Sequence, residues 1–249
     1  MASYAGSRVK DTAMAFNELG HQTGLSSTLR FDDVTLVVAT AETAPAVLRP
    51  CRAVVVAVET DAEDGQPVSG GSGGGGGGGG KLDFYDDDGV VRFLPTIAHI
   101  PDVYAFLHMA LNCQSVADAI NSILDKLAAA ARENPLRNRN VVIQQAADLR
   151  QAYLQTAAGD VWGTGSASLP RTPPRYFTFV RSQKTGGVYL IDGQDLSEID
   201  PAWPSVLRER KCMDDSTVLT ATVRSTIHEI CQKHAKSRPY SITALVSQD

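Results

Sequence analysis

The fold is decided by residues 175–193, which read Arg-Tyr-Phe-Thr-Phe-Val-Arg-Ser-Gln-Lys-Thr-Gly-Gly-Val-Tyr-Leu-Ile-Asp-Gly. An arm of aromatic and β-branched residues, 176–180, is followed by the turn pair Gly186-Gly187 and by a second apolar arm, 188–191. Two such arms on either side of a glycine pair are typical of an antiparallel strand pair. We therefore predict a β-hairpin that carries one carboxylate, Asp192, to the end of its return strand.

Hydrophobic periodicity predicts helices and strands on both sides of this hairpin. Pro101 is expected to open a helix, because the first helical N–H needs no acceptor within the helix. Ser115 and Asp118 have the spacing of a capping box and predict a second helix start. The expected elements are, in chain order, a helix over 9–19, strands over 34–39, 53–58 and 90–94, a helix from 101, a helix from 115 and a helix over 140–157.

Composition and charge are typical of one globular domain that spans residues 1–249. The chain has 249 residues, of which 43% are hydrophobic and 20% charged. A formal net charge of -5 argues against nucleic acid or an anionic membrane as the main partner. The longest apolar runs have the length of strands and not of membrane spans, and the first residues lack the apolar centre of a signal peptide.

The four cysteines, at positions 51, 113, 212 and 231, show no Cys-x-x-Cys pair and no Cys/His spacing of a metal site. We therefore expect reduced thiols in the cytoplasm or nucleus, with no metal ion and no cofactor.

Two segments are expected to lie outside the regular elements. Residues 61–80 are polar and then almost entirely glycine, which predicts a disordered insertion because such a segment buries little apolar surface. A phosphate-binding loop is disfavoured there, since Leu82 follows Lys81 where that motif has Ser or Thr. Residues 158–174, rich in Gly and Pro, predict a long irregular loop.

Five segments, taken in order, resemble the ubiquitin carboxyl-terminal hydrolases. The hairpin is similar to that family's late strand pair, His-Phe-x-x-x-Val, a turn, and Leu-Tyr-Glu-Leu-Asp-Gly. The other matching segments are Ala15-Phe-Asn-Glu-Leu-Gly20, Leu29-Arg-Phe-Asp-Asp-Val34, Arg49-Pro-Cys-Arg-Ala-Val-Val-Val56 and the helix and strand after Ser225. The resemblance implies a papain-like α/β (α+β) fold in which helices flank a central antiparallel sheet. It also implies that 158–174 is the crossover loop above the active cleft.

In that family a Cys thiolate at a helix N-terminus attacks the carbonyl after the last Gly of ubiquitin, a His transfers the proton, and an Asp orients the His. The resemblance, aligned through Thr96-Ile97 and His108-Met-Ala-Leu-Asn112, places Pro101 at the nucleophile position. Pro95 falls at the position of the oxyanion Gln, and Tyr176 at that of the general base. A proline ring cannot attack a carbonyl, and a phenol with an ordinary pKa near 10 is a poor base at neutral pH. Of the catalytic residues only the acid, Asp192, is kept.

Twelve helical positions separate Cys113 from Pro101 by about 18 Å, so Cys113 cannot reach the same cleft floor, and we expect it to be a buried core residue. The leading hypothesis is a catalytically inactive hydrolase homologue that binds ubiquitin, a ubiquitin-like protein or a larger complex. One alternative is an active thiol-dependent deubiquitinase, which requires a different alignment at both Pro101 and Tyr176. Another is a structural subunit without affinity for ubiquitin.

Overall fold

The computed structural model describes residues 12–35, 38, 50–59, 89–93, 100–113, 121–156, 174–192, 205–207, 217–235 and 238–248. The Gly-rich segment 61–80, residues 94–99 and most of the expected crossover loop lie outside this part of the chain.

An antiparallel sheet with the strand order β1-β6-β2-β3-β4-β5 forms the centre of the described structure. Its interior strands include β2 (Cys51–Val58) and β6 (Tyr240–Ser247). Every residue of β2 except Arg52 is buried, as the apolar run at 53–58 predicted. The edge strands are β1 (Leu29–Asp33) and β5 (Ser205–Leu207).

The predicted hairpin is confirmed as β3 (Arg175–Arg181) and β4 (Val188–Asp192). Gly186 in the turn has φ of +70°, a conformation that a residue without Cβ adopts at little cost. The Ser182 hydroxyl closes the turn by accepting hydrogen bonds from the backbone N–H groups of Lys184 and Thr185, at 3.1 and 2.9 Å.

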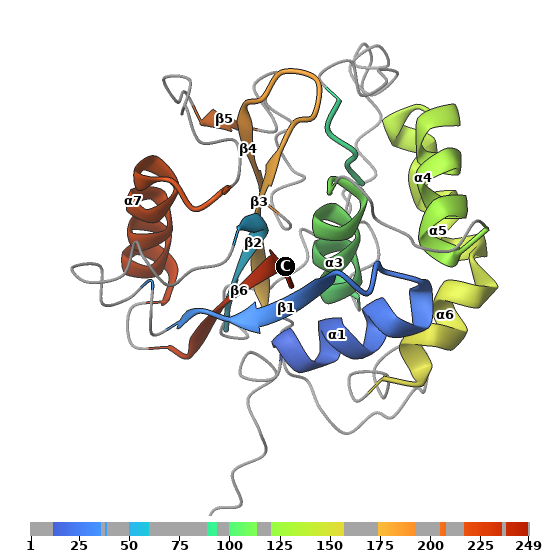
Figure 1. Cartoon of the computed structure of the whole chain (residues 1–249), viewed down its shortest axis with the longest axis horizontal. Coiled ribbons are helices and arrows are strands. Elements are labelled where there is room, and N and C mark those ends of the chain that lie inside the picture. Colours follow the sequence, from blue (N-terminus) through green and yellow to red (C-terminus); the bar gives the residue numbers. More distant parts are fainter. Residues whose placement is uncertain are drawn as a thin grey trace, which may run out of the picture.

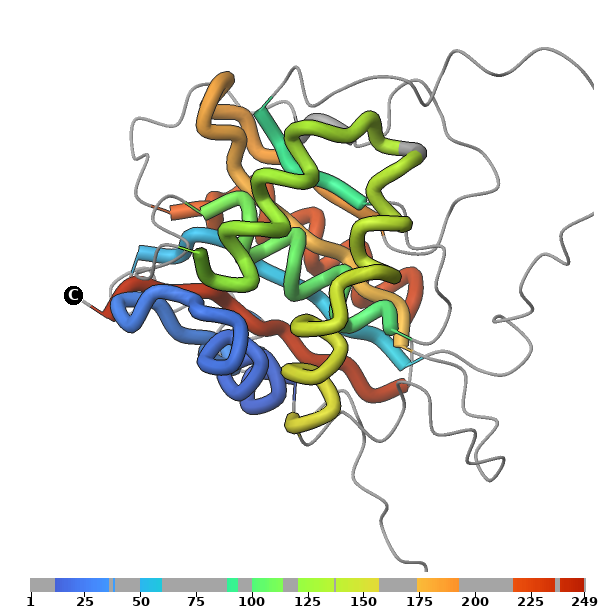
Figure 2. Tube along the Cα trace, turned by 90° about the vertical axis from the view of Figure 1, so that its right-hand side faces the viewer, coloured from blue at the N-terminus to red at the C-terminus, as the bar shows by residue number. Residues whose placement is uncertain are grey.

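Helices cover both faces of the sheet (Figure 1). One face packs against α1 (Thr12–Thr23) and α3 (Pro101–Leu111), and α4 (Ile123–Glu133), α5 (Arg139–Gln145) and α6 (Ala147–Leu154) form a further layer outside α3. Figure 2 looks onto this outer layer, with the sheet behind it. The opposite face packs against α7 (Ala221–Ile230), which continues as a π-helical turn, Cys231–Ala235.

Two hydrophobic cores result, and the alternation of β2 contributes to both. We call them the α3 core and the α7 core after the helix that each contains. Side chains of a strand point alternately to the two faces. The α3 core contains Ala53, Val55 and Ala57, and the α7 core contains Val54, Val56 and Val58.

The helix α3 lies between the sheet and the outer helices, and its residues from Val103 to Leu111 are all buried. A helix that is apolar on every side suits such a position. Pro101 is its first residue, as predicted, and Ile100 precedes it without a side-chain cap.

The predicted strand at 34–39 is wrong for its described residues, Val34, Thr35 and Val38. The Val34 N–H still bonds the Ile242 carbonyl of β6 at 2.8 Å, but the Val38 N–H bonds the Val34 carbonyl at 3.0 Å, which is a helical turn. Both valines are buried in the α7 core. Apolar residues four apart fit one face of a helical turn, so the run alone did not distinguish the two structures.

The predicted strand at 90–94 is also wrong for its described residues, 90–93. The side chains of His108 in α3 and of Asn112 after α3 make the hydrogen bonds that a neighbouring strand would otherwise make with this backbone. Asn112 accepts from the Val91 N–H and donates to the Val91 carbonyl, both at 2.7 Å. The His108 Nε2 accepts from the Phe93 N–H at 3.0 Å. These polar groups satisfy a buried backbone segment without a sheet.

Two helices expected to be continuous are interrupted within the described residues. The helix α4 begins at Ile123, and its cap is Ser122, whose hydroxyl accepts from the Asp125 N–H at 3.1 Å. Ser115 lies outside the described residues. The helix expected over 140–157 is divided at Ala146, where ψ of 80° ends α5 before α6 begins.

Candidate active-site region

The N-terminus of α3 holds the predicted nucleophile position. Pro101 is partly exposed there and follows the fully buried Ile100. The next residue, Asp102, accepts a hydrogen bond from the Tyr153 hydroxyl of α6 at 2.7 Å. A carboxylate in the first turn also interacts favourably with the positive end of the helix dipole. This helix start is therefore hydrogen-bonded to the outer layer, and its first residue, the predicted nucleophile position, is a proline.

The predicted base position, Tyr176, lies on β3. Its side chain is 5% exposed and belongs to the α3 core, so β3 presents it to the same face of the sheet as α3. In the ladder it lies opposite Ala57 of β2. The structure therefore places Pro101 and Tyr176 on the same side of the sheet.

Asp192, the predicted acid, lies at the end of β4 and directly opposite Phe177 of β3. Arg175 forms two contacts with its carboxylate, one of them from Nε to Oδ1 at 3.0 Å. The guanidinium of Arg175 also lies over the Phe177 ring, 4.9 Å from its centroid. Phe177 belongs to the α7 core. The described contacts thus associate Asp192 with Arg175 on the other face of the sheet.

Pro95, the predicted oxyanion position, lies outside the described residues. Of the loop 158–174, only Pro174 is described. Within the described ranges, no group of three or more His, Cys, Asp or Glu side chains is arranged to hold a metal ion. No helix in that same part of the chain is long and apolar enough to span a membrane.

The described cysteines are all poor sources of thiolate. Burial raises the pKa of Cys113 to about 12 and that of Cys231 to about 11. Burial also raises the pKa of Cys51, whose thiol donates to the Ala53 carbonyl at 3.3 Å. The prediction that Cys113 is a core residue is confirmed, since it is 7% exposed. Cys212 lies outside the described residues.

The side chains of His108 and Asn112 hydrogen-bond the backbone of residues 90–93, a role that the sequence did not indicate. Beyond its bonds to Val91, Asn112 donates to the His108 carbonyl at 2.7 Å. The two residues are one helical turn apart, so they reach the segment 90–93 from the same face of the helix. Their i, i+4 spacing was visible in the sequence, but only the structure shows that their target is this backbone.

Comparison with known protein families identifies the chain. The family model described as "Ubiquitin carboxyl-terminal hydrolase, family 1" matches residues 9–232. The chain therefore belongs to this family, and the resemblance found in the sequence is confirmed. A comparison with curated proteins found no match.

Solved structures with the same fold include two of Trichinella spiralis UCH37. One is UCH37 bound to ubiquitin vinyl methyl ester, with 15% sequence identity and a TM-score of 0.57, covering 94% of this chain and 79% of that chain. The other is the UCH37 catalytic domain bound to the same molecule, with 14% identity and a TM-score of 0.59, covering 95% of this chain and 93% of that chain. The expected papain-like fold, an antiparallel sheet between helices, is thus confirmed.

Proposed function

We propose that this chain is a catalytically inactive member of the ubiquitin carboxyl-terminal hydrolase family that binds ubiquitin or another protein partner. The observation that carries the proposal is the residue at the start of α3. Pro101 is its first residue, at the position where the sequence resemblance puts the family's cysteine. A proline at this position suits the helix but has no atom that can attack a carbonyl.

The chemistry of the thiols supports the proposal. A cysteine nucleophile needs a lowered pKa, as at a helix N-terminus or beside a cationic group. Cys113 instead follows the C-terminal end of α3 and has a pKa raised to about 12 by burial. The pKa values of Cys51 and Cys231 are raised as well.

The base position supports it independently. Tyr176, which the resemblance puts at the general-base position, lies in the α3 core on the face that α3 covers. A phenol at that position is a poor acceptor for a thiol proton at neutral pH. Loss of the nucleophile and of the base together leaves the family's mechanism with neither an attacking atom nor a group that transfers the proton.

A labelling experiment tests the loss of activity. The chain is incubated with ubiquitin vinyl methyl ester, the molecule present in the UCH37 structures, and analysed by intact mass. We expect no covalent adduct after hours at neutral pH, with an active family member as the positive control. An adduct that Cys113→Ala or Cys212→Ala abolishes would overturn the proposal in favour of an active deubiquitinase.

A titration tests the binding half of the proposal. Isotope-labelled ubiquitin is titrated with the unlabelled chain and followed by amide chemical shifts. We expect shifts confined to one surface of ubiquitin and saturating with the concentration of the chain. Unchanged spectra at several hundred micromolar would remove ubiquitin as the partner and favour a structural subunit.

A further inference from the structure

The register of the hairpin separates Asp192 from the residue that it is expected to orient. Asp192 lies directly opposite Phe177, and directly opposed residues of an antiparallel pair point to the same face. Phe177 belongs to the α7 core and Tyr176 to the α3 core. The alternation along β4 agrees, since Ile191 is in the α3 core and Leu190 packs against the α7 core. Asp192 therefore leaves the sheet on the α7 side.

Arg175 holds the carboxylate on that side. Arg175 and Phe177 are two positions apart on β3 and thus share a face. The guanidinium meets the carboxylate through both Nε and a terminal nitrogen, which is the planar, two-contact geometry that arginine favours. The two side chains are only 21% and 24% exposed, so solvent screens this pair less than a surface pair.

The ion pair also packs, through Arg175, against the aromatic ring of Phe177. The guanidinium lies over the Phe177 ring, and that ring packs against His234 with centroids 5.0 Å apart. His234 belongs to the π-helical turn after α7. The carboxylate is thus joined, through Arg175 and Phe177, to the layer of the molecule that lies opposite α3.

We propose that Arg175 holds Asp192 in an ion pair that stabilises the β3–β4 hairpin on the α7 face. The carboxylate is then not available to orient residue 176. The inference rests on the proposed function, because it takes 176 as the former base position. It adds a fourth departure from the hydrolase mechanism, after those expected at Pro101, Pro95 and Tyr176. Under this proposal the acid is retained for the stability of the hairpin and not as a remnant of catalysis.

A double-mutant cycle tests the clamp in the absence of ubiquitin. Arg175→Gln, Asp192→Asn and the double variant are unfolded with urea and compared with the parent chain. We expect the cycle to show a coupling of about fivefold or more in the unfolding equilibrium constant. The matched cycle of Tyr176→Phe with Asp192→Asn is expected to show less than about twofold. Equal effects in the two cycles, or no coupling to Arg175, would overturn the proposal.

The pKa of an imidazole placed at position 176 shows whether the Asp192 carboxylate faces that position. The variant Tyr176→His is compared with Tyr176→His/Asp192→Asn, and the new imidazole is titrated by NMR. A carboxylate that faces position 176 would raise the pKa of that imidazole by about one unit or more. We expect a difference below about 0.3 units, because the carboxylate faces Arg175. A raised pKa that Asp192→Asn removes would contradict the inference.

The outcomes of these two measurements do not depend on the outcome of the labelling experiment. Neither the stability cycle nor the imidazole titration involves ubiquitin or catalysis. An active enzyme would overturn the proposed function, whereas coupling between positions 176 and 192 would overturn only the assignment of Asp192.

Discussion

His108 shows how one side chain joins two parts of the fold. It is 2% exposed, its Nε2 accepts the Phe93 N–H at 3.0 Å, and its ring stacks on that of Phe93. Burial, together with the nearby Arg92, lowers the pKa of His108 to about 3. A proton on Nε2 would also remove the acceptor for the Phe93 N–H. The neutral imidazole is therefore part of the folded structure.

We expect His108 to make the protein less stable in acid. The folded pKa, about 3, lies below the ordinary value near 6.5, so between these pH values the unfolded chain binds a proton that the folded chain does not. The free energy of unfolding should fall by about 1.4 kcal/mol per pH unit as the pH drops below about 6. His108→Gln keeps an acceptor but does not titrate, so urea unfolding between pH 7 and 5 should show a smaller slope.

The exposed His21 of α1 provides the control for this comparison. His21→Gln should retain the pH dependence of the parent chain. Identical slopes for His108→Gln and the parent chain would contradict the assignment of the slope to His108.

The buried thiols lead to a second prediction at the scale of the residue. With a pKa near 12, Cys113 holds only about one part in ten thousand of thiolate at pH 8, where an ordinary thiol holds about a quarter. We expect alkylation of Cys113 by iodoacetamide to be at least about 100-fold slower in the folded chain than in urea. Peptide mass spectrometry over time measures both rates. Labelling at the unfolded rate would show that this thiol is accessible and ionised.

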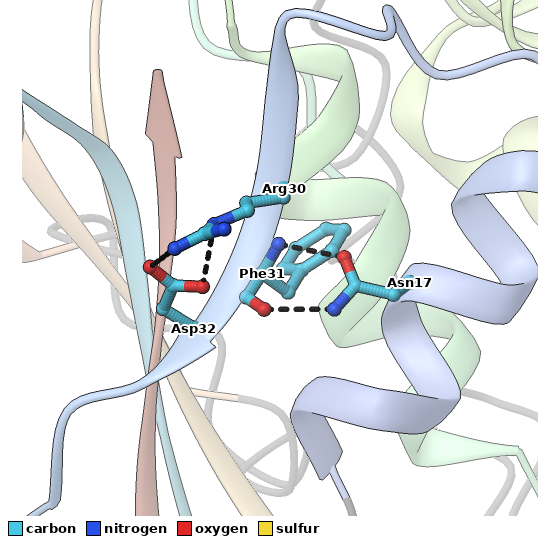
Figure 3. Close-up of polar contacts among 4 residues, drawn as sticks. All are labelled: Asn17, Arg30, Phe31 and Asp32. Atoms are coloured by element: carbon cyan, nitrogen blue, oxygen red, sulfur yellow. Dashed lines mark hydrogen bonds and ion pairs between the residues drawn. The ribbon is translucent and has the colours of Figure 1, made fainter. Parts of the chain in front are cut away.

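At the scale of the element, Asn17 completes the edge of the sheet (Figure 3). Its amide accepts from the Phe31 N–H and donates to the Phe31 carbonyl, both at 2.8 Å. A helix side chain thus makes the two bonds that another strand would make with β1. Beside it on the same strand, Arg30 pairs with Asp32, with Nε to Oδ1 at 2.8 Å. Charges and a blocked backbone both discourage pairing of an edge strand with another chain.

Removal of this amide should destabilise the fold and open the edge. Asn17→Ala leaves the Phe31 N–H and carbonyl without their side-chain partner, at a cost of about 1–3 kcal/mol. We expect that loss in urea unfolding, together with self-association that increases with concentration in light scattering. Gln22→Ala, at an exposed position of the same helix, should change neither. A monomeric Asn17→Ala variant of parental stability would contradict the role of Asn17.

At the scale of the whole molecule, β2 joins the two cores. Because its side chains alternate between the α3 core and the α7 core, neither core can lose its packing without disturbing the strand that the other uses. The described structure is therefore expected to unfold as one unit.

One substitution in each core tests this unity. Phe106→Ala removes a fully buried ring of α3, and Ile227→Ala removes a buried side chain of α7. Each should lower the free energy of unfolding by about 2–5 kcal/mol. Both variants should keep a single transition that circular dichroism and intrinsic fluorescence report at the same urea concentration. Separate transitions in either variant would show that the two layers fold independently.

Local pattern predicted those elements whose cause is local. The arms and glycine pair of the hairpin, and the proline that opens α3, lie within a few residues of the structure that they produce. The family resemblance then placed Pro101 and Tyr176 at two catalytic positions, which remain predictions. The strand predictions at 34–39 and 90–94 were wrong for their described residues, because an apolar run suits a strand, a helical turn or an irregular buried segment equally well.

The amino-acid sequence by itself determined that the first residue of α3 carries no nucleophile, because this follows from the identity of Pro101 and needs no coordinates. It also determined the alternation that divides β2 between two faces. Only the tertiary structure decided which face Asp192 occupies, and which side chains satisfy the backbone of Val91 and Phe93. Strand register depends on pairing between distant residues, and a shift of one residue moves a side chain to the opposite face of the sheet.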